Sequence, residues 1–197
     1  MALKRFPLEQ YATLELNQVA FPKTGMVVSQ TPLGAKFTTD SSVTGAYGVC
    51  ENGMWVVADK AAGVIDAPAA TTDKPIGIVY TTEKEYDIFH YGLKTFGRKV
   101  AGDYPRVGIL SVGDTVTTNC LQYDTNNFAN DAALDTYLKG DLTAASTAAY
   151  VVVKAGSAIP EIVKTLPQNY AGAYGRIVKY YTVPNGEKGV KYQMIRV

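Results

Sequence analysis

The chain has 197 residues, enough to bury one sizeable core, or one core with an arm or a small second lobe. Charged residues make up 19% of it, and the formal net charge is only +1. The chain therefore lacks the excess of positive charge that binds nucleic acid or an anionic membrane, so we expect neither as a direct partner. A surface this poor in charge is tolerable when partners cover much of it.

Targeting and redox features are sparse. No stretch of about 18 apolar residues could span a bilayer, and Lys4 and Arg5 are not followed by the apolar segment of a signal peptide, so we expect folding in a cytoplasm. Cys50 and Cys120 are predicted to be buried free thiols, and with a single histidine they cannot build a zinc site alone. We therefore expect no metal and no cofactor.

Residues 1–44 are predicted to form an extended N-terminal arm, because they contain three prolines and no sustained hydrophobic period. A short helix could follow Pro7 through Leu8–Leu14. The remaining apolar side chains must pack against a surface, either that of the β-rich domain of the same chain or that of a neighbouring chain. The candidate partner-binding residues of this arm are Leu3, Phe6, Tyr11, Phe21, Val27 and Val28.

From residue 45 to the C-terminus the pattern predicts a single β-rich domain of short strands punctuated by glycine. Asn52-Gly53 lies between two apolar runs, which predicts a hairpin. The stretch 74–89, KPIGIVYTTEKEYDIF, then predicts a long strand with a drier and a wetter face.

The stretch RVGILSVGDT, residues 106–115, has the spacing of a phosphate-binding P-loop. Asp114 stands where the lysine of that motif should be, and the residues after it are β-branched, whereas the motif must lead into a helix. We therefore predict a strand over Val107–Leu110, a turn at Val112–Asp114 and a second strand over Thr115–Tyr123.

Residues 124–146 interrupt the β pattern as an inserted loop with a short helix. Asp131 is the expected N-cap, 132–139 the body and Gly140 the C-cap. The opening of this loop resembles a calcium loop but lacks the glycine and the glutamate that an EF-hand needs, so a solvated loop is favoured.

Strands are predicted again at 150–156 and across PEIVKTL, followed by a C-terminal hairpin over 176–197. That hairpin carries Lys179, Lys188, Lys191 and Arg196 among tyrosines. In a nearly neutral protein we interpret them as lysines and arginine extending from a hairpin, not as a nucleic-acid site.

No catalytic constellation stands out, and we expect no enzymatic activity. His90 is the only histidine, and its neighbours Phe89 and Tyr91 suggest a packed or interface residue. Glu83, Glu85 and Asp87 alternate on one predicted strand face, where a solvated strand is favoured over a carboxylate pair. Together the elements predict a mainly β fold, a compact β-barrel or β-sandwich.

Two motifs carry a resemblance. Lys74–Val79, KPIGIV, and Val112–Val116, VGDTV, resemble segments of the small β-rich decoration (cement) proteins on the heads of tailed bacteriophages. The resemblance implies a non-enzymatic virion protein, made in the host cytoplasm, that binds the major capsid protein on the capsid surface. It also implies self-association, often as a trimer, and reinforcement of the shell against internal DNA pressure.

The sequence also fits two alternative hypotheses about function. A tail-tube or head-fibre subunit of a virion would be equally β-rich and would assemble into rings or tubes. A carbohydrate-binding module would use exposed tyrosines and Trp55 as a stacking platform.

Overall fold

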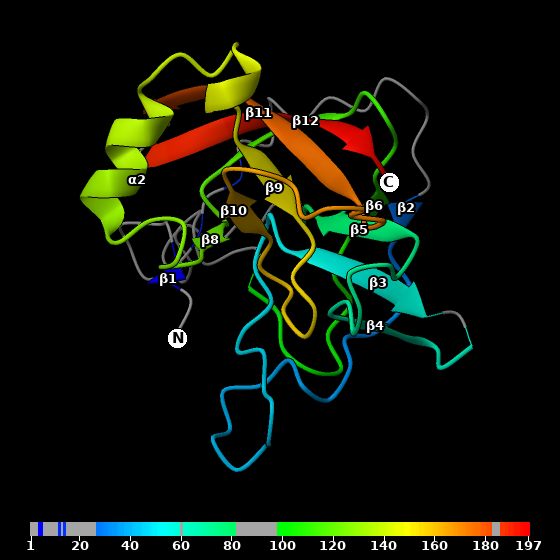
Figure 1. Ribbon diagram of the computed structural model, residues 1–197. Coiled ribbons are helices and arrows are strands. Elements are labelled where there is room, and N and C mark those ends of the chain that lie inside the picture. Colours follow the sequence, from blue (N-terminus) through cyan, green and yellow to red (C-terminus); the bar gives the residue numbers. More distant parts are fainter. Residues whose placement is uncertain are drawn as a thin grey trace.

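The computed structural model describes residues 4–5, 12, 14, 27–59, 61–81, 98–182 and 186–197. The fold is mainly β, as predicted, with two multistranded sheets in a sandwich-like arrangement and, among these described residues, one short α-helix at its side (Figure 1). Of the two architectures expected, the sandwich is the one that fits, and the described strands form no closed barrel.

The larger sheet has seven described strands, which pair antiparallel except for β8 with β10, which are parallel. In spatial order the strands are β1 (Lys4–Arg5), β8 (Gln122–Tyr123), β10 (Glu161–Val163), β9 (Tyr150–Val152), β11 (Tyr174–Thr182), β12 (Lys188–Arg196) and β7 (Thr115–Thr118). The strands predicted at 150–156 and in PEIVKTL are confirmed as β9 and β10.

The smaller sheet has five antiparallel strands. In order they are β2 (Val27–Val28), β6 (Val107–Ile109), β5 (Ile76–Val79), β3 (Trp55–Asp59) and β4 (Val64–Asp66). All four residues of β5 are buried, so the drier and wetter faces expected from the sequence do not occur over Ile76–Val79. Residues 82–89, the rest of that predicted strand, lie outside the described residues.

The first core lies between the sheets and is fastened by one buried polar contact. Trp55 of β3 donates from Nε1 to the hydroxyl oxygen of Tyr192 on β12 over 2.9 Å. The two rings meet edge to face with centroids 5.9 Å apart, and both side chains are at most 1% exposed. A buried indole N–H needs such an acceptor, so this bond fixes one sheet against the other.

The second core lies on the other face of the smaller sheet, where Val56 and Val79 point. Leu33 and Phe37, although part of the predicted arm, are buried in this core. Cys50 and Cys120 are buried there as free thiols, as predicted, and burial raises the pKa of the Cys50 thiol. After Phe37 the chain projects as the long loop at the bottom of Figure 1.

Helix α2 (Asp131–Leu138) confirms the predicted helix, with its caps displaced by one residue. Asn130, not Asp131, is the N-cap, and its side chain accepts from the amide of Ala133 over 2.9 Å. Asparagine caps as well as aspartate does. Asp131 instead accepts from the hydroxyl of Tyr123, a bond that ties the helix to the larger sheet. At the other end the C-cap is Lys139, and a single 3-10 turn, η2 (Ala145–Thr147), follows.

The turn at Asn52-Gly53 is confirmed, since Gly53 has a φ of 95°, but the predicted hairpin is wrong. Its two flanks do not pair with each other: Cys50 pairs with Lys99, and β3 pairs with β4 and β5. The side chain of Asn52 bonds both the N–H and the carbonyl oxygen of Thr81. The asparagine therefore extends the ladder of β5 and turns the chain away from a hairpin.

The turn at 112–114 is also confirmed, with a φ of 97° at Gly113. The strands on its two sides belong to different sheets, because β6 lies in the smaller one and β7 in the larger. The single strand predicted over 115–123 is wrong. It stops at Thr118, whose Oγ1 accepts from the amide of Cys120, and such local bonds replace the ladder before β8 begins.

The C-terminal hairpin of β11 and β12 is confirmed, and it contains two bulges. The register skips Val178 between the pairs at Ile177 and Lys179, and it skips Ile195 on the opposite strand. A bulge takes one residue out of the ladder and re-aims its side chain. Val178 and Ile195 are 50% and 43% exposed, so both bulges present an apolar side chain to solvent.

Glu161 of β10 is expected to make the stability of the protein depend measurably on pH. Burial raises the pKa of its carboxyl, although Lys154 lies 3.5 Å away and acts in the opposite direction. The pKa of Glu161 is higher in the folded protein than in the unfolded chain. Stability is therefore lost as the pH rises from the unfolded-state pKa through the folded-state pKa. We expect Glu161→Gln to be more stable than the wild type at pH 7, with the difference vanishing below about pH 4.

Urea unfolding at several pH values measures this difference, and Asp141→Asn is the matched control of opposite sign. The Thr143 hydroxyl and amide lower the pKa of Asp141, so its contribution is present at neutral pH and is lost on acidification. Equal pH dependence of wild type and Glu161→Gln would contradict the assignment.

Candidate functional site

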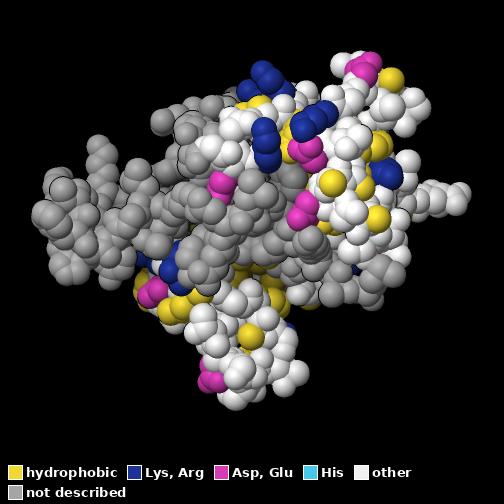
Figure 2. Space-filling model, turned by 90° about the vertical axis from the view of Figure 1, so that its left-hand side faces the viewer, with side chains coloured by type: hydrophobic (Ala, Val, Ile, Leu, Met, Phe, Trp, Pro, Cys, Tyr) yellow, Lys and Arg dark blue, Asp and Glu magenta, His cyan; other side chains and the backbone are white. Residues whose placement is uncertain are grey.

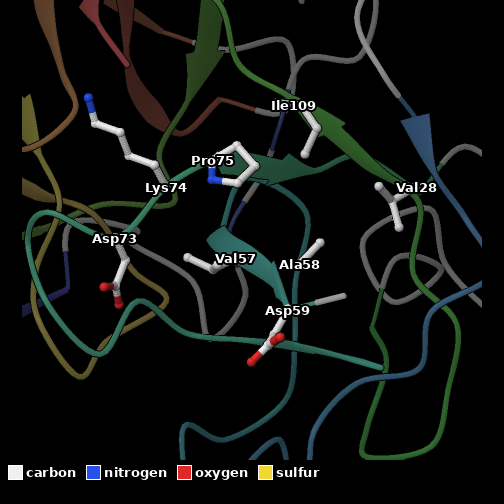
Figure 3. Close-up of a pocket in the computed structure, with 8 residues that line it drawn as sticks. All are labelled: Val28, Val57, Ala58, Asp59, Asp73, Lys74, Pro75 and Ile109. Carbon is white, nitrogen blue, oxygen red and sulfur yellow. The ribbon is translucent and has the colours of Figure 1, made fainter. Parts of the chain in front are cut away.

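A pocket of about 560 Å³ opens on the smaller sheet, and its lining comes from four strands or their ends (Figure 3). This volume lies in the range of ligand and side-chain binding pockets. The residues that line it are Val28, Val57, Ala58, Asp59, Asp73, Lys74, Pro75 and Ile109.

The walls of the pocket are apolar. Val28 comes from β2, Ile109 from β6 and Val57 from β3, while Pro75 directly precedes β5. These strands are neighbours in the sheet, which explains how residues far apart in the sequence meet here. Val57 and Pro75 stand at the centre of the view in Figure 3.

The rim of the pocket is acidic. One oxygen of Asp59 accepts from the amides of Ala61 and Ala62 over 2.8 and 3.0 Å, and one oxygen of Asp73 accepts from Ala70 over 2.8 Å. Within the described part of the chain, the second oxygen of each carboxylate makes no hydrogen bond. Each therefore offers a free acceptor.

Lys74 does not neutralise this rim. Its ammonium donates to the backbone oxygen of Val197 over 2.8 Å, and in Figure 3 it points away from the two carboxylates. The pocket thus combines apolar walls with two carboxylates, which suits an apolar group that carries a positive charge.

One of the six predicted arm residues lines this pocket. This residue is Val28, and its neighbour in the chain, Val27, is 52% exposed on β2, which with β4 forms the two edges of the smaller sheet among the described strands. The other four, Leu3, Phe6, Tyr11 and Phe21, lie outside the described residues.

The described fragments of the N-terminal segment contact the body of the protein. Lys4–Arg5 pairs with β8 as strand β1. The amide of Ala12 donates to a carboxylate oxygen of Glu51 over 2.8 Å, and Leu14 pairs with Thr118. Its described residues therefore pair with two strands of the larger sheet, β8 and β7, and bond Glu51, which precedes β3.

Residues 106–115, which have P-loop spacing, form no phosphate cradle. Asp114 is 1% exposed, and its carboxylate accepts from the amide of Ser111 over 2.7 Å. The amide of Gly113 donates to Met194, and Asp114 accepts from that residue in return. The backbone groups of this turn are used to attach it to β12.

Other residues considered for chemistry fall into two groups. Trp55 is buried, so it offers no face to a sugar ring. His90, Glu83, Glu85 and Asp87 lie outside the described residues. Within the residues that are described, no three metal-ligating side chains cluster, and no helix is long and apolar enough to cross a membrane.

Comparisons of the chain with protein-family models, curated proteins and solved structures found no match.

Asp59 and Asp73 were not identified from the sequence as site residues. Each precedes a glycine- or proline-containing turn, and such a position predicts only a turn. Their approach to Val28 and Ile109 depends on strand pairing across the sheet, which no local pattern encodes.

Proposed function

We propose that this protein is a non-enzymatic structural component of a tailed-bacteriophage virion that binds the outside of the capsid and stabilises the shell. One observation carries the proposal: the N-terminal segment presents an apolar edge, in which exposed Val27 lies beside a pocket lined by Val28. The resemblance of 74–79 and 112–116 to decoration proteins supports the same class.

The edge strand gives this binding a physical basis. Among the described strands, β2 pairs with β6 only. No described strand pairs with its other edge, whose backbone groups can therefore bond an added strand. An extended segment of a major capsid protein could add to that edge, with an apolar side chain beside Val27. Repetition of such weak contacts over neighbouring capsid subunits would give tight attachment through multivalency.

The carbohydrate-binding alternative is disfavoured by Trp55. The indole is 1% exposed and donates to Tyr192, so its role is structural. A sugar-stacking site would need an exposed aromatic face in its place.

Co-sedimentation with expanded capsids that lack this protein tests the proposal. We expect saturable binding of the wild type and at least about tenfold weaker binding of Val27→Asp, since a charge at an apolar contact must be desolvated. Val100→Asp is the matched control, because Val100 is 42% exposed and lies outside β2, the pocket lining and the two motifs of the resemblance.

Two results would overturn the proposal. One is wild-type protein that does not bind capsids from the same phage. The other is purified protein that assembles into stacked rings or tubes, which would indicate a tail-tube subunit.

A further inference from the structure

The C-terminal hairpin presents an unusual combination of exposed groups. The two bulges expose Val178 and Ile195, as described above. Lys179 on β11 lies directly opposite Lys191 on β12. Figure 2 shows Lys and Arg side chains, with Asp and Glu side chains among them, around hydrophobic ones on the upper part of the molecule, at the height of α2 and this hairpin in Figure 1.

The lysine pair costs stability in the isolated chain. Like charges at directly opposed strand positions repel each other. No carboxylate of the described residues lies within ion-pair distance of either lysine, although other ion pairs form elsewhere, at Lys139 and Lys154. An acidic surface placed on the hairpin would relieve this repulsion.

The pocket on the smaller sheet has the complementary properties. It offers apolar walls for an apolar side chain, and the free oxygens of Asp59 and Asp73 for lysine ammonium groups. Both partners of such a contact are therefore present on the same chain.

We propose that this hairpin docks into the pocket of a second copy of the chain, with Val178 against the apolar walls and Lys179 and Lys191 facing Asp59 and Asp73. The net charge of +1 favours this occupant, because two copies repel each other little. The contact joins two different patches, so each copy can both give and receive it, and we expect it to close into a single small ring, in contrast to the stacked rings or tubes of a tail-tube subunit. It does not depend on capsid binding.

Light scattering of the purified full chain at several concentrations, combined with charge reversal, tests the contact. The wild type is expected to associate. The double variant Lys179→Asp with Lys191→Asp sets an acidic hairpin against the acidic pocket. The double variant Asp59→Lys with Asp73→Lys sets the basic hairpin against a basic pocket. Each double variant is expected to weaken association at least about tenfold and to stay monomeric at concentrations where the wild type associates.

An equimolar mixture of the two double variants provides the decisive measurement. The reversed hairpin then meets the reversed pocket, and the two unreversed patches also meet, so association is expected to return. Lys36→Asp, a reversal on the exposed turn just before Phe37, is the control and leaves the mass of the assembly unchanged.

Asp59 and Asp73 also cap turns, so their replacement by lysine could unfold the chain. Asp59→Asn with Asp73→Asn retains the acceptor oxygens, and circular dichroism confirms folding while association weakens. A wild type that is monomeric at all concentrations overturns the proposal, as do folded double variants that associate like the wild type, or a mixture that stays monomeric.

Discussion

Replacing Trp55 by alanine is expected to lower the free energy of unfolding by about 3–5 kcal/mol. The side chain fills the first core and makes the bond to Tyr192 that joins the two sheets. For a domain whose total stability is about 5–15 kcal/mol, this loss is large enough to populate unfolded chains. Urea unfolding followed by far-UV circular dichroism measures it, because Trp55 is the only tryptophan.

The hydrogen bond can be separated from the ring. Tyr192→Phe keeps the edge-to-face contact but leaves the indole N–H buried without this acceptor, so we expect a loss of about 1–3 kcal/mol. Tyr104→Phe removes a hydroxyl from a side chain that is 55% exposed, and should change stability by less than about 0.5 kcal/mol. Equal stabilities for the two variants would show that the bond does not hold the sheets together.

Gly53→Ala is expected to destabilise the protein by about 2–4 kcal/mol, for two independent reasons. The residue has a φ of 95°, a conformation that alanine adopts only at a cost. A Cβ at this position would also lie 2.6 Å from the Cβ of Cys120 and 2.8 Å from Oγ1 of Thr118. Chemical unfolding of the variant measures the sum of both effects.

Gly102→Ala isolates the first of these reasons. Its φ of 87° is similar, but a Cβ at that position would meet no atom of a non-neighbouring residue within 4 Å. We expect a loss of about 1–2 kcal/mol there, so the excess at Gly53 reports the collision with the core. Equal losses at the two glycines would contradict the packing argument.

Features of the fold that depend on neighbouring residues could be predicted from the sequence. The C-terminal hairpin needs only a turn and two adjacent strands, and β11 and β12 pair as expected. The helix at 131–138 and the turns at Gly53 and Gly113 also follow from local chemistry.

Strand partners over long distances could not be predicted. The turn at Gly113 has the same local signature whether it closes a hairpin or sends the chain from one sheet to the other. Only the pairing of β7 with β12, more than 70 residues later, decides between these outcomes. The same limit applies to the pocket, whose apolar walls join residues from positions 28 to 109.

The two proposed contacts use neighbouring parts of the smaller sheet in different ways. The proposed capsid contact uses the exposed edge at Val27, whereas the proposed self-association uses the pocket with its carboxylates, Asp59 and Asp73. The Val27→Asp variant and the aspartate variants should therefore separate one contact from the other.

The bond between Trp55 and Tyr192 also has a consequence during synthesis. Its partners are 137 residues apart, so the ribosome produces Trp55 roughly 7–27 seconds before Tyr192, at about 5–20 residues per second. Throughout that interval, the face of β3 that packs against β12 in the folded protein is not yet covered by β12. The nascent chain should therefore bind chaperones until Lys188–Arg196 has emerged and the two sheets can close.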